Sequence, residues 1–345
     1  MLKNNHTLFH DKQISMAHGA GGEASRRLVE GLFAPAFANS VLENMADAAL
    51  LEPVAGRLAM TTDSFVVRPL RFPGGSIGEL AVNGTVNDLA VSGATPIALA
   101  VGFILEAGLD CDTLRAEVQA MAEAARNAKV CIVAGDTKVV EHGKADGMYI
   151  STTGIGTVDS RADLGPDRVR PTDRVLLSGP IGAHGMTIMI ARADLDLAAD
   201  VRSDTRPLTA LVRALLDEAG QGVKWMRDAT RGGVATVLNE MARDAGLPIA
   251  LREEAIPVDD VVRGGCELLG LDPLHVANEG QFIAIVSADC ADAALRALRA
   301  TPGGERACDI GEVTTGRLAR VVAKAAYGGV RVVDMLIGDP LPRIC

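Results

Sequence analysis

Aromatic residues are scarce in this chain: they make up 3% of its 345 residues, with one Trp and two Tyr. Proteins that bind single-stranded nucleic acid stack bases on aromatic side chains, so this scarcity disfavours such a role. The formal net charge of −10 points the same way, because phosphate backbones bind basic surfaces. We therefore expect no nucleic-acid partner, although a single nucleotide needs only one local site.

The chain also lacks a long apolar run and an N-terminal secretion signal. The longest apolar stretch, near residues 96–108, is well short of the roughly 18 residues that span a bilayer. Residues 1–16 contain no apolar core of a signal peptide. We expect a cytoplasmic protein with no membrane contact.

Cysteine is present six times but never as a CxxC pair. This spacing argues against a structural zinc site and against a disulfide framework. The last of the six, Cys345, ends the chain in the sequence "DPLPRIC". Chain termini are usually exposed, so this thiol is expected to be accessible.

Hydrophobic residues make up 48% of the sequence, which is typical of an ordered globular protein, and the length suggests two domains. Strand and helix patterns alternate in both halves, so we predict an α+β protein. Residues 159–173 are highly charged and contain two prolines, and they form the predicted linker. The predicted domains are residues 1–158 and 174–333, followed by a mobile tail over 334–345.

Four aspartates are predicted to form a metal site. Asp63, Asp136 and Asp228 lie in or at the ends of predicted strands, and Asp88 lies in a helix of small residues. Carboxylates in apolar surroundings are costly unless a cation neutralises them. Mg²⁺ fits this need, because it typically takes one or two carboxylates together with nucleotide phosphates. Any single aspartate is also explained by a turn or a helix cap.

A glycine-rich segment, "AHGAGGE" at residues 17–23, precedes the first predicted helix. Such a segment can present backbone N–H groups to a phosphate, although a flexible loop explains it equally well. The chain contains neither GxxxxGK[ST] nor a strand-linked GxGxxG with a following acid, which excludes the standard phosphate-binding loops. His18 and His184 lie in glycine-rich segments and are assigned no catalytic role.

The segments together closely resemble the HypE family of carbamoyl dehydratases, which act in [NiFe]-hydrogenase maturation. The superfamily also contains aminoimidazole ribonucleotide synthetase and selenophosphate synthetase, which lack the "PRIC" ending. Ala20 departs from the pattern, since a serine is common there. The matching segments span nearly the whole chain and include "AHGAGG", "GTVNDLAVSGATP", "AGDTKVV", "DATRGGVATVLNE", "ANEGQF" and "LPRIC".

The resemblance implies a PurM-like fold, in which the N-terminal sheet pairs with that of a second subunit to form a barrel. It also implies a C-terminal α/β domain and an ATP site with Mg²⁺ in the cleft between the domains. Lys138 and Glu279 would then handle protons, although a surface lysine and a turn glutamate are the simpler readings of each. The residues assigned to ATP and its metal are Gly19, Gly21, Gly22, Asp63, Asn83, Asn87, Asp88, Asp136, Thr137, Asp228, Thr230 and Arg231.

The resemblance further implies that a carbamoyltransferase loads Cys345. The protein would convert this thiocarbamate to a thiocyanate, and an iron-carrying scaffold complex would accept the cyanide for the hydrogenase. Residues 334–345 have an extended reach of roughly 40 Å. Gly338 is the expected hinge and Pro340 and Pro342 the stiff spacer. Arg343 is expected to pair with phosphate or with the terminal carboxylate.

Two other functions remain open from the residues alone. The first is a ligase or kinase of the same superfamily that turns over ATP with a free metabolite and does not need Cys345. The second is a non-catalytic carrier that presents Cys345 to a metal or a partner and does not need its aspartates.

Overall fold

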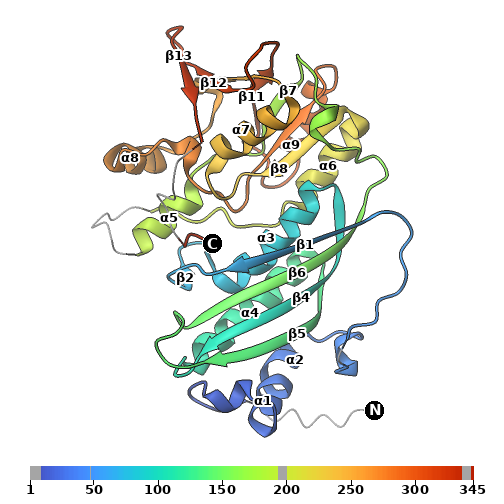
Figure 1. Cartoon of the computed structure of the whole chain (residues 1–345), viewed down its shortest axis with the longest axis vertical. Helices are drawn as coiled ribbons and strands as arrows, with labels where there is room; N and C mark the ends of the chain where they lie inside the picture. Colours follow the sequence, from blue (N-terminus) through green and yellow to red (C-terminus); the bar gives the residue numbers. More distant parts are fainter. Residues whose placement is uncertain (1–8, 47, 193–199, 336–342) are drawn as a thin grey trace.

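The computed structural model describes residues 9–46, 48–192, 200–335 and 343–345 (Figure 1). Its strands form two large sheets, one in each half of the chain. Figure 1 shows the four-stranded sheet in the lower half of the molecule and the seven-stranded sheet in the upper half. Among the described residues, no helix has both the length and the apolar character needed to cross a bilayer.

The N-terminal sheet has the strand order β1-β6-β4-β5. The parallel strands β4 and β5 are joined by a helix, as a parallel pair requires, and the other pairs are antiparallel. The elements are β1 (Leu58–Phe65), β4 (Ala94–Glu106), α4 (Cys111–Ala128), β5 (Cys131–Val140) and β6 (Met148–Val158), with a short hairpin of β2 (Arg71–Phe72) and β3 (Gly75–Ser76) after β1.

Two helices cover one face of this sheet, namely α3 (Ile77–Val91) and α4. The Asp110 side chain caps α4 by accepting a hydrogen bond from the Asp112 N–H at 2.8 Å. The two helices touch at Gly78, where a Cβ atom would lie 2.3 Å from the carbonyl oxygen of Glu117. Only glycine therefore allows this crossing.

A helical segment lies along the β5 edge of the sheet. The sequence has helical spacing over residues 23–39, and the structure divides this segment into α1 (Glu23–Leu28), a π-helical turn and α2 (Ala34–Ala36). Phe33 of the turn stacks on Phe103 of β4 with ring centroids 4.8 Å apart. The π-helical turn covers Val29–Phe33, and 3₁₀ turns at Met16–Gly19 and Leu42–Asn44 flank the segment.

The opposite face of the N-terminal sheet is open. Figure 1 shows this face toward the viewer, with no helix among the described residues in front of it. Leu58, Met60 and Ile104 are exposed there by 57%, 73% and 42%. An open sheet face with exposed apolar side chains is typical of an interaction surface.

The C-terminal sheet has the order β13-β12-β9-β11-β7-β10-β8. It is mostly antiparallel, with β12 and β9 as a parallel pair. Its strands are β7 (Arg174–Leu177), β8 (Val223–Asp228), β9 (Ile249–Arg252), β10 (Phe282–Val286), β11 (Cys308–Val313), β12 (Val321–Lys324) and β13 (Val330–Val333).

Helices pack on both faces of this sheet. Along β10, Ile283 and Ile285 join one hydrophobic core with α7, whereas Phe282 and its alternate neighbours join a second core with α6 and α9. This two-sided burial explains why β10 reads as a continuous apolar run. The helices are α5 (Ala183–Ala191), α6 (Thr209–Ala219), α7 (Gly233–Ala245), α8 (Asp260–Leu269) and α9 (Ala291–Ala300), and 3₁₀ turns lie at Pro166–Arg168, Gly220–Gly222, Glu253–Ala255 and Pro273–His275.

The two halves meet along the end of α3. This helix packs against β8 and α6, and its residues Ala90 and Val91 belong to the same core as Leu211 of α6. The C-terminal end of α3 is therefore enclosed between the domains.

The close contact at Gly78 gives a test of this packing. We expect Gly78→Ala to lower the apparent melting temperature by roughly 5 °C, because the new methyl group meets a backbone atom that cannot move aside. Gly264→Ala on α8 is the matched control, since no atom lies within 4 Å of its Cβ position and alanine favours the helix. Equal melting temperatures for the two variants would contradict this account of the helix crossing.

Candidate active site

Asp63 and Asp88 face each other between β1 and α3. A Cβ on Gly84 would lie 3.6 Å from the Asp63 carboxylate, so this side chain points at α3. Asp88 lies four residues after Gly84, on the same face of the helix. The Thr61 hydroxyl, two residues before Asp63, donates to the Asp88 carboxylate at 2.7 Å. The two aspartates therefore share one side of the sheet.

Asp228 and Glu279 come to the same place from the C-terminal domain. Asp228 ends β8, which packs against α3, and it pairs in register with Phe282 of β10. Glu279 lies three residues before Phe282, and the Asn87 amide of α3 donates to the Glu279 carbonyl at 3.3 Å. We call Asp63, Asp88, Asp228 and Glu279 the acidic cluster.

Burial raises the pKa of every carboxyl group in the acidic cluster. The pKa of Asp228 rises to about 7, first because of burial and then because of the negative charge of Asp88. Glu279 is raised well above its ordinary pKa by burial, and the charges of Asp228 and Asp204 add to the effect. Burial also raises the pKa of Asp63 and Asp88. The cluster thus favours protons or a cation over unpaired negative charges.

The acidic cluster suits a Mg²⁺ ion that is shared with phosphates. Among the residues described here, no three His, Cys, Asp or Glu side chains form a complete metal-binding group. Mg²⁺ needs only one or two carboxylates when phosphates and water complete its shell. The positive charge of Arg231 reaches Asp63, Asp88 and Glu279 and lowers their pKa values in part.

The remaining predicted residues near the cluster have different surroundings. The Asn87 amide accepts from the Leu208 N–H at 2.8 Å and donates to the Arg206 carbonyl at 3.0 Å, so it is engaged with main-chain groups. The Thr230 carbonyl accepts from the Gly233 N–H at 2.9 Å at the start of α7. Asn83 is 1% exposed, and its Oδ1 atom has no hydrogen-bond partner among the described atoms, which leaves an acceptor for a ligand.

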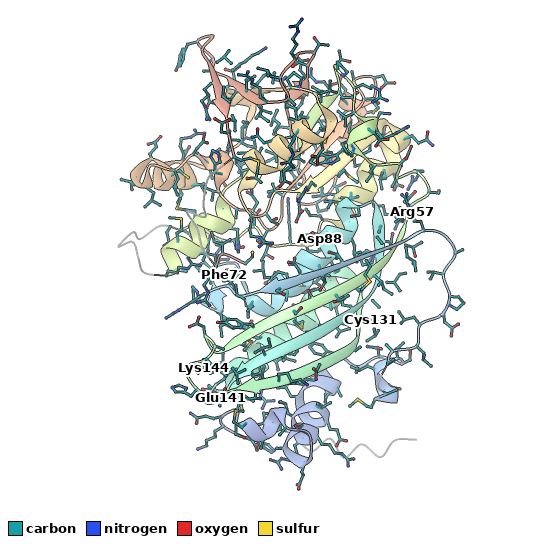
Figure 2. All side chains as sticks on the ribbon, in the orientation of Figure 1. Arg57, Phe72, Asp88, Cys131, Glu141 and Lys144 are labelled. Carbon is teal, nitrogen blue, oxygen red and sulfur yellow. The ribbon has the colours of Figure 1, made fainter. Side chains whose placement is uncertain are left out.

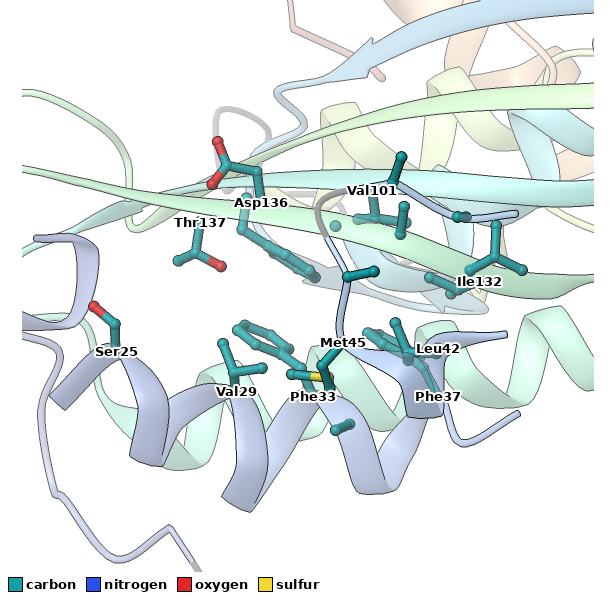
Figure 3. Close-up of a pocket in the computed structure, with 18 of the residues that line it drawn as sticks. Ser25, Val29, Phe33, Phe37, Leu42, Met45, Val101, Ile132, Asp136 and Thr137 are labelled. Carbon is teal, nitrogen blue, oxygen red and sulfur yellow. The ribbon is translucent and has the colours of Figure 1, made fainter. Parts of the chain in front are cut away.

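A second site, the N-terminal pocket, lies at the β5 edge of the sheet (Figure 3). The pocket encloses about 390 Å³. Its apolar wall includes Phe33, Phe37 and Ile132, and its polar end includes Thr137 and Lys138. A pocket with an apolar wall and a few polar groups at one end is typical of a small-molecule site.

The predicted glycine-rich turn closes the polar end of the N-terminal pocket. Gly21 and Gly22 have positive φ angles of 75° and 106°, which side chains disfavour. A Cβ on Gly19 would lie 2.5 Å from the backbone nitrogen of Val139, so glycine permits the turn to lie on β5. The Ser25 hydroxyl accepts from the Gly21 N–H at 3.0 Å and donates to the His18 carbonyl at 2.8 Å.

Asp136 and Lys138 belong to the N-terminal pocket and not to the acidic cluster. Their side chains form an ion pair at 2.9 Å, which lowers the pKa of Asp136, and both are largely exposed. Asp63 of β1 pairs with Thr152 of β6, Thr152 pairs with Val101 of β4, and Val101 pairs with Gly135 of β5. Three strand spacings, or roughly 14 Å, therefore separate Asp63 from Gly135, which is the residue before Asp136. Within one chain the structure therefore brings together neither the four aspartates nor Lys138 and Glu279.

Figure 2 makes this separation visible. Asp88 lies close to the C-terminal domain, whereas Cys131 and Glu141, at the two ends of β5, lie on the far edge of the sheet. The predicted site residues thus divide into two groups on the same chain.

The tip of the tail is bound just beyond the end of β1, the strand that carries Asp63. The backbone N–H of Val66, three residues after Asp63, donates to a carboxylate oxygen of Cys345 at 3.0 Å. Arg343 forms an ion pair with Asp146, and its guanidinium lies 5.9 Å from the Tyr149 ring centre. Asp146 is thus a partner of Arg343 that the sequence did not predict, and pairing of Arg343 with a phosphate or with the terminal carboxylate stays a prediction. The expected hinge and spacer, Gly338, Pro340 and Pro342, lie outside the described residues.

Known proteins resemble both halves of the chain and its whole length. Residues 45–158 match the model of the AIR synthase related protein N-terminal domain, and residues 170–324 match that of the C-terminal domain. Carbamoyl dehydratase HypE of Azotobacter vinelandii is 50% identical over 332 residues, which cover 96% of this chain and 97% of the relative.

Solved structures agree with this match. The crystal structure of hydrogenase maturation protein HypE in complex with ATP has a TM-score of 0.92 at 48% identity and covers 96% of this chain and 99% of its own. A crystal structure of a HypE-HypF complex matches with a TM-score of 0.79 at 45% identity over 90% of this chain and 99% of its own. The predicted two-domain PurM-like fold is thus confirmed, and the chain belongs to the HypE family.

Proposed function

We propose that this protein uses ATP to dehydrate a carbamoyl group carried on the sulfur of Cys345. The single observation that carries this proposal is the position of the chain end. Cys345 accepts a hydrogen bond from Val66, which directly follows β1 and lies three residues after Asp63 of the acidic cluster. The name of the relatives, carbamoyl dehydratase, and the ATP bound to a similar structure support the same reaction.

The reaction requires a leaving group for oxygen. The γ-phosphoryl group of ATP is transferred to the carbamoyl oxygen of S–C(=O)–NH₂, which turns a poor leaving group into phosphate. Two N–H protons then leave, and the products are S–C≡N, ADP and phosphate. Phosphoryl transfer depends mainly on positioning and on positive charge around the phosphates.

The acidic cluster provides groups for this chemistry. Asp63, Asp88 and Asp228 would hold Mg²⁺ against the phosphates, and the ion would neutralise the charge that develops during transfer. Glu279 would accept a proton from the carbamoyl nitrogen. It can do so once the positive charge of bound Mg²⁺ and Arg231 offsets the negative neighbours that raise its pKa.

The N-terminal pocket would bind the nucleoside part of ATP. Its apolar wall suits a base, and the glycine-rich turn with Thr137 and Lys138 suits the phosphates. The two groups of residues lie about 14 Å apart on one chain, and a second copy of the chain would bring one group of each copy next to the other group of its partner.

A homodimer would bring the two groups together in this way. The described part of the sheet has β1 and β5 as its outer strands and an open apolar face, as expected for half of a barrel. A two-fold axis along the barrel would place β5 of one subunit beside β1 of the other. The N-terminal pocket of one subunit would then face the acidic cluster of its partner, and Lys138 would approach Glu279 across the interface.

Two further partners follow from the reaction. A carbamoyltransferase must load Cys345, and the HypE-HypF complex among the similar structures supports an interaction of this kind. An iron-carrying scaffold complex would accept the cyanide. We expect this exchange to take place in the cytoplasm.

The role of Cys345 is tested by intact-mass spectrometry. After incubation with the carbamoyltransferase, its substrates and ATP, we expect the mass of one carbamoyl group to appear and then one water to be lost. Cys345→Ala should show neither change and should still bind ATP. Cys290→Ala, which removes another thiol, should behave like the wild type. A cyanated Cys345→Ala chain, or ATP turnover with a free metabolite in that variant, would refute the proposal.

The acidic cluster predicts a pH-dependent affinity for Mg·ATP. With a pKa of about 7, Asp228 is mostly protonated at pH 6 and must lose its proton when the metal binds. Binding should therefore strengthen by about tenfold between pH 6 and pH 8 from this group. Asp228→Asn should bind more weakly and show less pH dependence, whereas Asp292→Asn on α9 should match the wild type. Calorimetry measures this, and equal pH profiles for wild type and Asp228→Asn would remove Asp228 from the metal site.

The shared site is tested with mixed dimers. Asp88→Asn and Lys138→Ala homodimers should each be inactive. Co-expression of both variants should restore about one quarter of the wild-type activity, because half of the dimers are mixed and each mixed dimer has one intact site. A mixture that stays inactive, with the mixed dimer shown to be present, would place both residues in a site within one subunit.

A further inference from the structure

The end of the tail is bound through its main chain by elements from both domains. The carbonyl oxygen of Ile344 accepts a hydrogen bond from Nε2 of His184 on α5 at 2.8 Å. A carboxylate oxygen of Cys345 accepts one from the Val66 N–H at 3.0 Å, and Arg192 at the end of α5 donates to the carbonyl of Arg343. Figure 1 shows the C-terminus between α5 and the N-terminal domain.

His184 is also held by contacts that do not involve the tail. Its ring is buried and lies edge-on to Phe72, with ring centres 5.6 Å apart. Nδ1 lies 2.8 Å from the Ser203 hydroxyl. Burial lowers the pKa of the imidazole, so it is neutral with one donor and one acceptor nitrogen. Because the Ile344 carbonyl can only accept, Nε2 carries the hydrogen and Nδ1 accepts from Ser203.

The segment that fixes His184 also fixes the loop of Glu279. Next to Ser203, the Asp204 carboxylate accepts the N–H of Glu279 at 3.2 Å and the N–H of Gly280 at 3.1 Å. A Cβ on Gly280 would lie 1.8 Å from the Asp204 carbonyl oxygen, so the two stretches of backbone are in direct contact. The receptor for the tail and the loop that carries Glu279 therefore share one rigid support.

The Ile344 side chain is 3% exposed and belongs to the N-terminal hydrophobic core. Burial of the Ile344 side chain contributes to the affinity of the tail for the rest of the protein. The hydrogen bond to the Ile344 carbonyl fixes which residue of the tail lies at this place. A slip of one residue would bury Arg343 or Cys345 in the place of Ile344. The two contacts together define where the next residue, Cys345, must lie.

We propose that His184 is a positioning residue for the dehydration: its Nε2–H holds the Ile344 carbonyl and so sets the sulfur of Cys345 at the acidic cluster. This inference rests on the proposed function. His184 does not touch the reacting group, and its partner is absent whenever the tail leaves to be loaded. Loss of the bond should therefore slow dehydration and leave loading unaffected.

The test compares His184→Leu and His184→Gln in the full-length protein. The tail is loaded by the carbamoyltransferase, Mg·ATP is added, and the loss of water is followed in a single turnover by intact mass. His184→Leu should dehydrate roughly 10- to 100-fold more slowly, because a small displacement of a reacting group is costly. Its loading rate and ATP affinity should equal those of the wild type.

His184→Gln keeps an N–H donor at a similar reach and should recover most of the rate. His142→Leu, at an exposed histidine, is the matched control and should match the wild type. A Leu variant at the wild-type rate, or a Gln variant as slow as Leu, overturns the inference. If His184→Leu does not fold, Ser203→Ala provides the test: it removes the hydroxyl that fixes the ring and should slow dehydration without changing loading. An unchanged rate in Ser203→Ala overturns the inference.

The wild type in the same experiment distinguishes a failure of the proposed function from a failure of the role of His184. A loaded wild-type chain that does not lose water with Mg·ATP refutes the proposed function itself. A wild type that does lose water, alongside an equally fast His184→Leu, refutes only the role of His184.

Discussion

The structure depends on the burial of four carboxyl groups between its two domains. Asp63 and Asp88 come from the N-terminal domain, and Asp228 and Glu279 come from the C-terminal domain. Burial raises their pKa values and the negative charges of neighbouring acids add to this for Asp228 and Glu279, so protons or a cation at this place stabilise the closed interface. The same constraint makes the site receptive to Mg²⁺ with phosphates. In the proposed reaction, Glu279 would act as a base only after Mg²⁺ has bound with the nucleotide, which would couple proton removal to the presence of the nucleotide.

The second constraint is the width of the N-terminal sheet. Its strands place the acidic cluster at the β1 edge and the N-terminal pocket at the β5 edge, with α3 and α4 covering the sheet between them. The proposed dimer would join these edges and would also cover the open apolar face. In the proposed function the thiol of Cys345 would also have to reach a partner enzyme and return to a defined position. The contacts of His184 and Val66 with the last two residues supply that position.

Much of the fold could be predicted from the sequence. The small residues around Asp88 correctly indicated the helix α3, the apolar run Phe282–Val286 is typical of a buried strand such as β10, and a glycine such as Gly246 is typical of a helix end, where α7 stops. The short strands β9 and β13 and the helix α8 were not predicted, because four residues carry too little periodicity and α8 contains two glycines. The aspartates were correctly seen as unusual, but strand order decides which of them meet, and the sequence contains no direct signal for it. His184 was missed because its partner lies 160 residues away.

The central claim is that the Cys345 sulfur meets the metal-bound nucleotide at the acidic cluster. It is tested most directly by replacing Mg²⁺ with Mn²⁺, adding a non-hydrolysable ATP analogue, and loading Cys345 with a ¹³C-labelled carbamoyl group. Electron–nuclear double resonance then reports the distance between the metal and the labelled carbon. The account predicts a resolved ¹³C coupling that disappears in Asp228→Asn. Bound Mn²⁺ without a ¹³C coupling would contradict it.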